Sequence, residues 1–267
     1  MISLLLIPFL VCVALVLIHV HFGVKVLARG ILFIDLAIAQ WAGLGYLLGH
    51  FWQIENAALL YGISFGFTLV PALLLTGIRS LQPQTNYLEA VIGVLYIVAA
   101  ATATVVVSIT GMEFHHLENM LVGHLLFVTP SELLAATAIY ALVGAIHYWA
   151  RKWLCTSQSK GADLLFYVTF GLVVTSSVKL AGVLAVFSFL VLPALIMLPF
   201  SASQSRQLRG GWIIGIFASI AGLAVSIYSD IPPGVSVILA LAGIWIGSVG
   251  IWIVRRSSDR ALNNPDA

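Results

Sequence analysis

The chain has 267 residues, of which 61% are hydrophobic and only 8% are charged, and its formal net charge is +2. Soluble domains carry about 25% charged residues, so this composition excludes an ordinary water-soluble protein and indicates a protein of the lipid bilayer. The two cysteines, Cys12 and Cys155, are too few for a disulfide framework or a thiolate metal site. The basic residues are scattered along the chain, which gives no support to nucleic-acid binding.

Apolar runs long enough to cross a bilayer follow one another along nearly the whole chain. A spanning helix needs about 20 predominantly apolar residues, and Gly, Pro or charged residues end each run. The first run lacks the features of a secretory signal peptide, so we count it as a span. The sequence therefore predicts one all-α transmembrane domain over residues 1–267, a bundle of eight or nine helices at 2–20, 31–49, 58–77, 89–110, 132–150, 163–180, 182–200, 211–228 and 234–254. The sixth and seventh runs are almost continuous, and only residues 179–182 divide them.

The basic residues predict the direction in which the helices cross. Lys and Arg are retained on the cytoplasmic side of bacterial inner-membrane proteins. With nine spans and the N-terminus outside, all of the 12 basic residues except Lys179 fall on the cytoplasmic side. We therefore expect a multi-pass protein of the bacterial inner membrane, with its N-terminus outside and its C-terminus in the cytoplasm.

Asp35 and Gln40 are polar residues of the second predicted span. A charged residue at the bilayer centre costs about 2.5 to 3.5 kcal/mol, so each one is a candidate for function. On a helix these two residues lie about 140° apart and do not share a face. Two interpretations of Asp35 stay open: it lines a path through the membrane, or it reaches the cytoplasmic interface and pairs with Lys25 or Arg29.

The connection between the fourth and fifth predicted spans lies on the predicted outer side. Its second half, residues 120–129, is apolar but too short to cross, so we expect a re-entrant or interfacial element over about 112–130. Imidazole and carboxylate groups suit zinc and manganese, and the connection contains Glu113, His115, His116, Glu118 and His124. A solvated polar loop is the alternative, because adjacent histidines on a helix point about 100° apart.

The cytoplasmic segment 201–210, SASQSRQLRG, is short, polar and compatible with a helix. It is a candidate docking helix for a cytoplasmic partner, and a plain connecting loop is the alternative. The sequence contains no Gly-rich phosphate-binding loop with a lysine. If the protein draws energy from ATP, another subunit must bind the nucleotide.

Three stretches of the sequence resemble the metal-ion (ABC-3) permeases of bacterial ABC importers for zinc and manganese. In the first stretch, the spacing is similar to the pattern RxxxFxGDALSHAxxxG of that family, and its residues are Arg29, Phe33, Ala37, Gln40, Gly45 and Gly49. In the second, LVGHLLFVTPSEL at 121–133 is similar to LFGxILxVSxxDL. The third stretch is VKLAGVLAVFSFLVLPA at 178–194, which is followed by Gly222, Ser226, Asp230, Pro232 or Pro233, and Gly234. It resembles KxxGxLLxxxLLxxPA followed by GxxxSxxxDxPxG.

This resemblance implies a fold like that of type II ABC importers and a homodimer around a central path. It also implies two ATP-hydrolysing subunits on the cytoplasmic side and an extracytoplasmic binding protein that delivers the metal. The resemblance places the coupling contacts with the ATPase at Ser203, Gln204, Arg206 and Arg209.

The sequence departs from the family at two places. The Asp and His thought to meet the metal fall at Leu36 and Gln40, and the small residue after that His becomes Trp41. After Pro193 and Ala194 the chain continues as LIML instead of ATAR.

The resulting expectation is a permease subunit, not an enzyme, that binds no resident cofactor and carries zinc or manganese. The alternatives are a permease for a chelated metal or another small solute, and a stand-alone secondary transporter. The candidate path residues are Asp35, Gln40, His115, His116 and His124.

Overall fold

The computed structural model describes residues 2–81, 84–110, 123–156 and 159–263, and this part of the chain is helical and contains no strand. The long helices are α1 (Ile2–Arg29), α2 (Ile34–Phe51), α3 (Ala57–Leu81), α4 (Thr85–Thr110), α6 (Pro130–Trp149), α8 (Lys160–Met197), α9 (Gln204–Ser229) and α10 (Pro233–Asn263). Three short helices connect them, namely η1 (Leu125–Phe127), α7 (Arg151–Thr156) and η2 (Leu198–Phe200). The all-α prediction is confirmed.

Seven helices of the described residues are long and apolar enough to cross a membrane. Each of the nine predicted runs coincides with a helix over most of its length, although residues 31–33 precede α2. Two features explain why seven candidates are found instead of nine. Lys160–Phe200 counts as one candidate although it contains the sixth and seventh predicted runs, and α2 is not among the seven. Helix α2 contains Asp35, Gln40 and His50, which lower its hydropathy.

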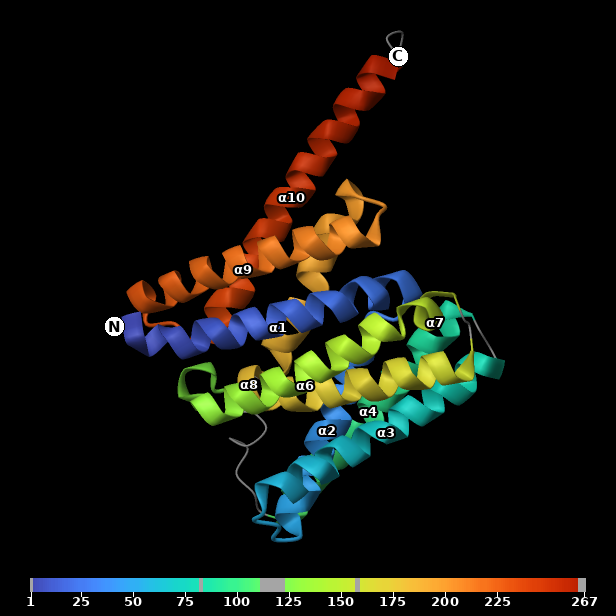
Figure 1. The fold of residues 1–267 in the computed structure, drawn as a ribbon, viewed down its shortest axis with the longest axis vertical. Helices are drawn as coiled ribbons and strands as arrows, with labels where there is room; N and C mark the ends of the chain where they lie inside the picture. Colours follow the sequence, from blue (N-terminus) through green and yellow to red (C-terminus); the bar gives the residue numbers. More distant parts are fainter. Residues whose placement is uncertain (1, 82–83, 111–122, 157–158, 264–267) are drawn as a thin grey trace.

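Helix α8 is broken at Gly182, where φ is 78° and ψ is 162°. This left-handed region of the backbone favours glycine. A side chain on Gly123, which has φ 70°, would collide with the backbone of Ala181 and Gly182, so the segment before η1 lies against the break. Figure 1 shows the first half of α8, in yellow, alongside α6, and the second half, in amber, turning away from it. The predicted division at residues 179–182 is therefore a real bend.

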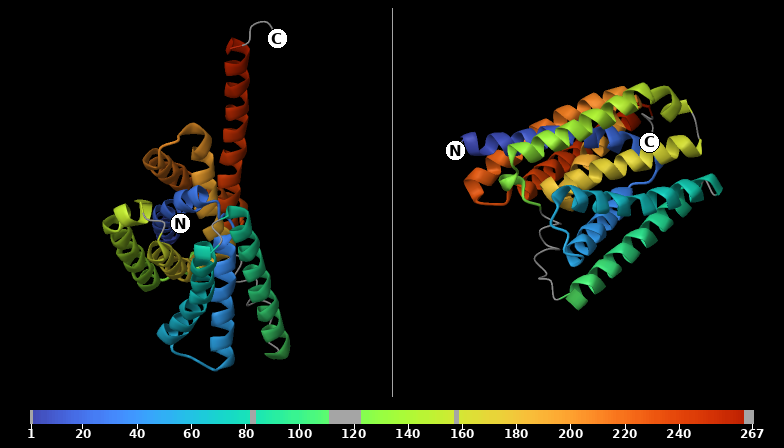
Figure 2. Two further views of the ribbon diagram at one scale, coloured as in Figure 1. Left: turned by 90° about the vertical axis from the view of Figure 1, so that its right-hand side faces the viewer. Right: turned by 60° about the horizontal axis from the view of Figure 1, so that its bottom comes forward.

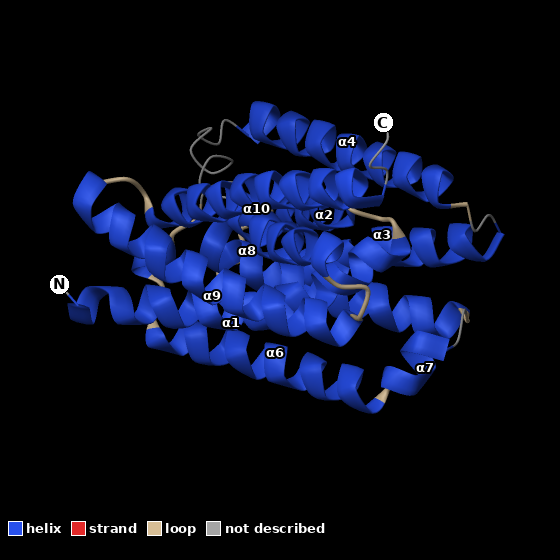
Figure 3. Cartoon of the chain, turned by 90° about the horizontal axis from the view of Figure 1, so that it is seen from above, coloured by secondary structure: helices blue, strands red, loops and turns tan. Residues whose placement is uncertain are grey.

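The helices form a bundle in which α1 and α8 occupy the centre. Helix α1 contacts α8, α9 and α6, while α2 contacts α3 and α4 and also reaches α8 (Figures 1 and 3). The largest fully buried side chains are concentrated on these two central helices and include Phe22, Phe166, Tyr167, Phe170 and Phe189. Lipid is as apolar as these residues, so close packing rather than exclusion of water holds the helices together.

Several helices are longer than the apolar runs that predicted them. Helix α1 continues through Gly23 to Arg29 and ends before Gly30, which has φ 66°. The last helix, α10, runs on past residue 254 and extends beyond the other helices (Figure 2).

Candidate functional site

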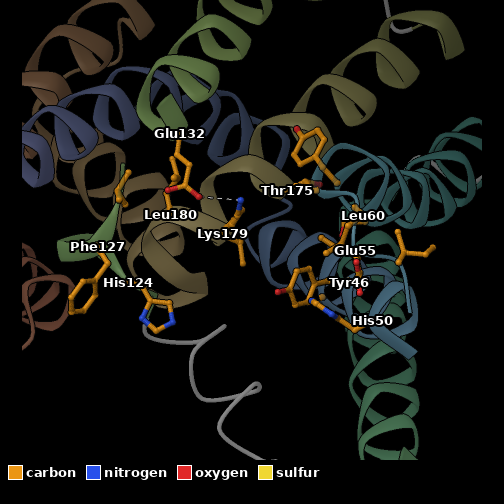
Figure 4. A pocket seen from close by; sticks show the side chains of 18 of the residues that line it. Tyr46, His50, Glu55, Leu60, His124, Phe127, Glu132, Thr175, Lys179 and Leu180 are labelled. Carbon is orange, nitrogen blue, oxygen red and sulfur yellow. Dashed lines mark hydrogen bonds and ion pairs between the residues drawn. The ribbon is translucent and has the colours of Figure 1, made fainter. Parts of the chain in front are cut away.

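A cavity of about 1090 Å³ lies between α2, α3, η1, α6 and the first half of α8 (Figure 4). The residues around it come from the end of α2, the loop that follows, the start of α6 and the part of α8 just before the break. The polar side chains on its walls are Tyr46, His50, Gln53, Glu55, Tyr61, Ser64, His124, Glu132, Thr175 and Lys179.

Lys179 and Glu132 form an ion pair on the wall of this cavity, with Lys179 Nζ 3.1 Å from Glu132 Oε1 (Figure 4). The sequence Thr129-Pro130-Ser131-Glu132 builds the start of α6. Glu132 N–H donates to Thr129 Oγ1 at 3.3 Å, and Thr129 N–H donates back to Glu132 Oε2 at 3.1 Å. This reciprocal capping box, with proline at the first helical position, fixes the Glu132 carboxylate toward Lys179.

Helix α2 ends at the cavity in a Schellman motif. The N–H of Ile54 donates to the carbonyl of Gly49 at 3.1 Å, and the N–H of Gln53 donates to the carbonyl of His50 at 2.9 Å. Gln53 has φ 56°, a left-handed conformation that glycine usually occupies at this position. This turn returns the chain, so that Glu55 and His50 line the same cavity.

The ring of His50 contacts Tyr46, one helical turn earlier, with the ring centroids 4.4 Å apart and nearly perpendicular. Figure 4 shows Tyr46, His50 and Glu55 on one side of the cavity, and His124 with Phe127 on the other. The Lys179–Glu132 pair lies between the two groups in that view.

Gln40 lies on a face of α2 that leads to the cavity. Leu36, Gln40, Gly43 and His50 fall within about 80° around the helix, and Gly43 and His50 line the cavity. Leu36 and Gln40 are half-buried, so this face stays partly open in the single chain. Trp41 turns away from it, because its Nε1–H donates to the carbonyl of Leu95 on α4 at 3.1 Å.

Asp35 does not pair with Lys25 or Arg29. Its side chain is fully buried, and neither carboxylate oxygen has a hydrogen-bond partner among the described residues. The predicted ion pair was wrong, because Lys25 contacts His147 of α6 and Arg29 binds Asp163 of α8. Asp35 is also absent from the cavity wall, so the structure does not bring it together with His124.

The Arg29 guanidinium binds Asp163 at the start of α8, with Nη1 2.7 Å from Oδ1. Arg79 Nε of α3 lies 3.4 Å from the other oxygen of Asp163. Arg29 also stacks over the Phe166 ring at 4.1 Å from its centroid. The buried Asp163 carboxylate therefore joins α1, α3 and α8 near the first residues of α8.

Lys25 Nζ donates to His147 Nδ1 of α6 at 3.0 Å. Thr169 donates its hydroxyl hydrogen to the Leu165 carbonyl at 2.7 Å, and its oxygen lies 2.8 Å from His147 Nε2. Nε2 of His147 therefore carries the proton, which leaves Nδ1 to accept from Lys25. His21 Nε2 also lies 3.1 Å from that Nδ1.

His115 and His116 lie outside the described residues, as does the first part of the predicted re-entrant element. His124 is exposed and lines the cavity. No group of three His, Cys, Asp or Glu residues within the described ranges could hold a metal ion. Sequence reasoning missed the contributions of His50, Glu55 and Glu132, although the Thr-Pro-Ser-Glu capping pattern was a readable signal for the last.

The predicted coupling segment is neither a separate helix nor a plain loop. Helix α9 begins at Gln204, so most of the segment forms the first turns of the predicted eighth span. Gln207 folds back and donates to the Ser201 carbonyl at 2.6 Å. Gln204, Arg206 and Arg209 are exposed, and Ser203 precedes α9 as its N-cap residue.

Known proteins with similar sequences and folds are transport subunits. The chain is 23% identical over 250 residues to the high-affinity zinc uptake system membrane protein ZnuB of Haemophilus influenzae, covering 89% of this chain and 93% of that protein. It is 26% identical over 200 residues to ZnuB of Buchnera aphidicola subsp. Baizongia pistaciae, covering 64% of this chain and 75% of the relative.

Among solved structures, the fold is similar to a chain of PsaBC from Streptococcus pneumoniae in complex with Fab. The TM-score is 0.75 at 17% sequence identity, and the match covers 92% of this chain and 90% of that chain. The ABC 3 transport family matches residues 1–251. This match spans all the helices that surround the cavity, and the protein described here is therefore a member of the ABC 3 transport family.

Proposed function

We propose that this chain is the permease subunit of an ABC importer and forms the membrane path for a divalent metal ion, zinc or manganese. One observation carries this proposal. The face of α2 with the half-buried Leu36 and Gln40 continues to Gly43 and His50, which line the cavity. Imidazole and carboxylate groups, which suit these metals, gather at the cavity, and Gln40 continues the polar face into the bundle. Related proteins named as zinc uptake membrane proteins support the choice of cargo.

The incomplete burial of Gln40 also favours a second copy of the chain as a partner. A polar side chain such as Gln40 is unfavourable against lipid, so another protein surface or a water-filled path is expected to cover it. A homodimer around a central path meets this requirement. That the chain is one subunit of a multi-subunit ABC transporter follows from its family.

The remaining partners belong to the same proposal. A separate cytoplasmic subunit hydrolyses ATP, and it contacts the exposed start of α9 through Ser203, Gln204, Arg206 and Arg209. An extracytoplasmic protein delivers the metal to the cavity. This arrangement needs the cavity end of the bundle outside and the start of α9 in the cytoplasm, as the distribution of basic residues predicts. The chain holds no resident cofactor, and the metal is its cargo.

A chelated metal is the second candidate for the cargo. Leu36 and Gln40 stand where a carboxylate and an imidazole are expected, and neither is a good ligand for a bare ion. A cavity of about 1090 Å³ is also large enough for a small organic ligand.

Reconstitution of the whole transporter in vesicles tests the proposal. Uptake and ATP hydrolysis are measured with Zn²⁺, with Mn²⁺ and with a zinc–citrate chelate. We expect free Zn²⁺ or Mn²⁺ to stimulate both activities and Gln40→Ala to reduce uptake. Stimulation by the chelate alone favours the second candidate, and stimulation by none of the three contradicts a metal cargo.

In parallel, Arg206→Glu with Arg209→Glu should weaken co-purification of the ATPase subunit.

The remaining candidate path residues are compared in the same vesicles as Asp35→Ala, as a variant with both His115 and His116 replaced by Ala, and as His124→Ala. A residue keeps its assignment to the path only if its variant changes the dependence of ATP hydrolysis on metal concentration.

A further inference from the structure

We propose that His50 and Glu55 form a capture site for a divalent transition-metal cation on the wall of the cavity. The inference rests on the proposed function and deepens it, because it names the residues that first bind the cargo. Neither residue belongs to the candidate pairs that the sequence motifs suggest. The site lies at the end of α2, several turns from Gln40.

The chemistry of the two side chains suits such a cation. A histidine nitrogen and a glutamate oxygen are common ligands of zinc, and both also bind manganese. Both residues line the cavity, and Figure 4 shows them on the same side of it, apart from His124. Tyr46 packs against the ring of His50 with the ring centroids 4.4 Å apart, which limits the orientations of the imidazole.

The backbone between the two residues is held in an unusual conformation. Gln53, at φ 56°, is one of two non-glycine residues with positive φ in the described chain. A left-handed conformation costs a residue with a Cβ about 1 to 2 kcal/mol, and such cost is often found at functional sites. Here the strained residue closes the Schellman turn that returns Glu55 to the end of α2. The carboxyl end of α2 also carries partial negative charge, which favours a nearby cation.

The charges on the cavity wall favour a cation near Glu55. Glu55 and Glu132 contribute two negative charges and Lys179 contributes one positive charge, so the wall has a formal charge of −1. Lys179 lies 3.1 Å from Glu132, and their charges largely offset each other. Glu55 forms no ion pair with another described residue, so its carboxylate supplies the net negative charge.

Two protein ligands make an exchangeable site rather than a permanent one. Structural zinc sites use four protein ligands, whereas a two-ligand site leaves the other positions to water. A transport path needs binding that is strong enough to collect the ion and weak enough to release it. His50 and Glu55 would supply two ligands from the cavity wall, which matches this requirement.

The experiment measures metal binding to the full-length permease alone, purified in detergent without an affinity tag that contains histidine. Zn²⁺ is titrated in competition with a chromophoric chelator, and Co²⁺ serves as a second probe. We expect one site in the wild type, with affinity at least 10-fold lower in His50→Ala and in Glu55→Gln. His50→Gln keeps a side chain of similar size against Tyr46, and its thermal unfolding shows whether the fold is kept.

Two control variants locate the site. Asp230→Asn removes a carboxylate at the turn between α9 and α10, outside the cavity, and asparagine tolerates the left-handed φ of 51° found there. Its affinity for Zn²⁺ should equal that of the wild type. His124→Ala removes the imidazole on the opposite wall. If His124→Ala weakens binding and His50→Ala does not, the site has been placed on the wrong wall.

The outcomes separate this inference from the proposed function. If the wild type transports metal while His50→Ala and Glu55→Gln bind Zn²⁺ like the wild type, the capture site is wrong and the function stands. Absence of Zn²⁺ and Co²⁺ binding to the wild-type permease also overturns the capture site. If the complete transporter shows no stimulation by metal, the proposed function itself fails.

Discussion

The first half of α8 carries charged residues near both ends, and the two ends differ in how their charges are surrounded. Near its start, Asp163 is buried and holds Arg29 and Arg79 of two other helices. Just before its break, Lys179 pairs with Glu132 on a cavity wall. The Lys179 side chain is 57% exposed and the Glu132 side chain is 36% exposed. The positions are 16 residues apart, or about 24 Å along a helix.

This difference indicates different roles for the two clusters. In the buried cluster, removal of one group leaves the others charged and unpaired in a medium that solvates them poorly. In the cavity, water reaches the charged groups, and an exposed ion pair contributes about 0 to 1 kcal/mol to stability. The buried cluster therefore maintains the fold, whereas the exposed pair is free to respond to an ion that enters the cavity.

Asp163→Asn is expected to have the largest effect on stability. The substitution leaves Arg29 and Arg79 without their carboxylate, which should lower the free energy of unfolding by about 3 to 5 kcal/mol. Thermal unfolding of the purified permease in detergent measures the change. Lys179→Met serves as the control, because it removes an ion pair from the same helix at an exposed position. Equal losses in the two variants would contradict the contrast between the two ends.

Lys179→Met is expected to change metal binding more than stability. It makes the formal charge of the cavity wall more negative by one unit, and a charge in a watery cavity changes the binding free energy of a divalent ion by about 1 kcal/mol. The affinity for Zn²⁺ should therefore rise roughly 3- to 10-fold, while stability falls by less than about 1 kcal/mol.

Glu132→Gln provides the opposite charge change in the same competition titration, and it should lower the affinity for Zn²⁺. A fall in affinity in both variants would show that the pair acts by holding the shape of the cavity and not through its charge.

The smallest expected effect comes from Gln53→Gly at the end of α2. Glycine adopts the left-handed conformation without steric cost but loses more entropy on folding, so the free energy of unfolding should rise by no more than about 1 kcal/mol. Gln53→Val should instead lower it, because a β-branched residue is strained at positive φ. Zn²⁺ affinity should stay unchanged in Gln53→Gly. A loss of affinity in that variant would assign a direct role to the Gln53 side chain.

The sequence by itself determined the membrane setting and the helical runs. Hydropathy and helix length are local properties, because each span must satisfy its own backbone hydrogen bonds in lipid. The division at residues 179–182 was also readable, since Gly182 adopts the φ of 78° that breaks α8. Motifs spread over most of the chain were enough to indicate the family, which the match over residues 1–251 confirms.

Only the tertiary structure decided which polar residues meet. Asp35 was a candidate from its position in a span, yet its burial depends on how α2 packs against its neighbours, which hydropathy does not encode. Glu132 and Lys179 come from different helices, and the capping box on α6 together with the break in α8 brings them within 3.1 Å. His50 and Glu55 share a cavity because a left-handed Gln53 closes the end of α2. These contacts depend on the packing of whole helices, whose register the sequence of any one span leaves open.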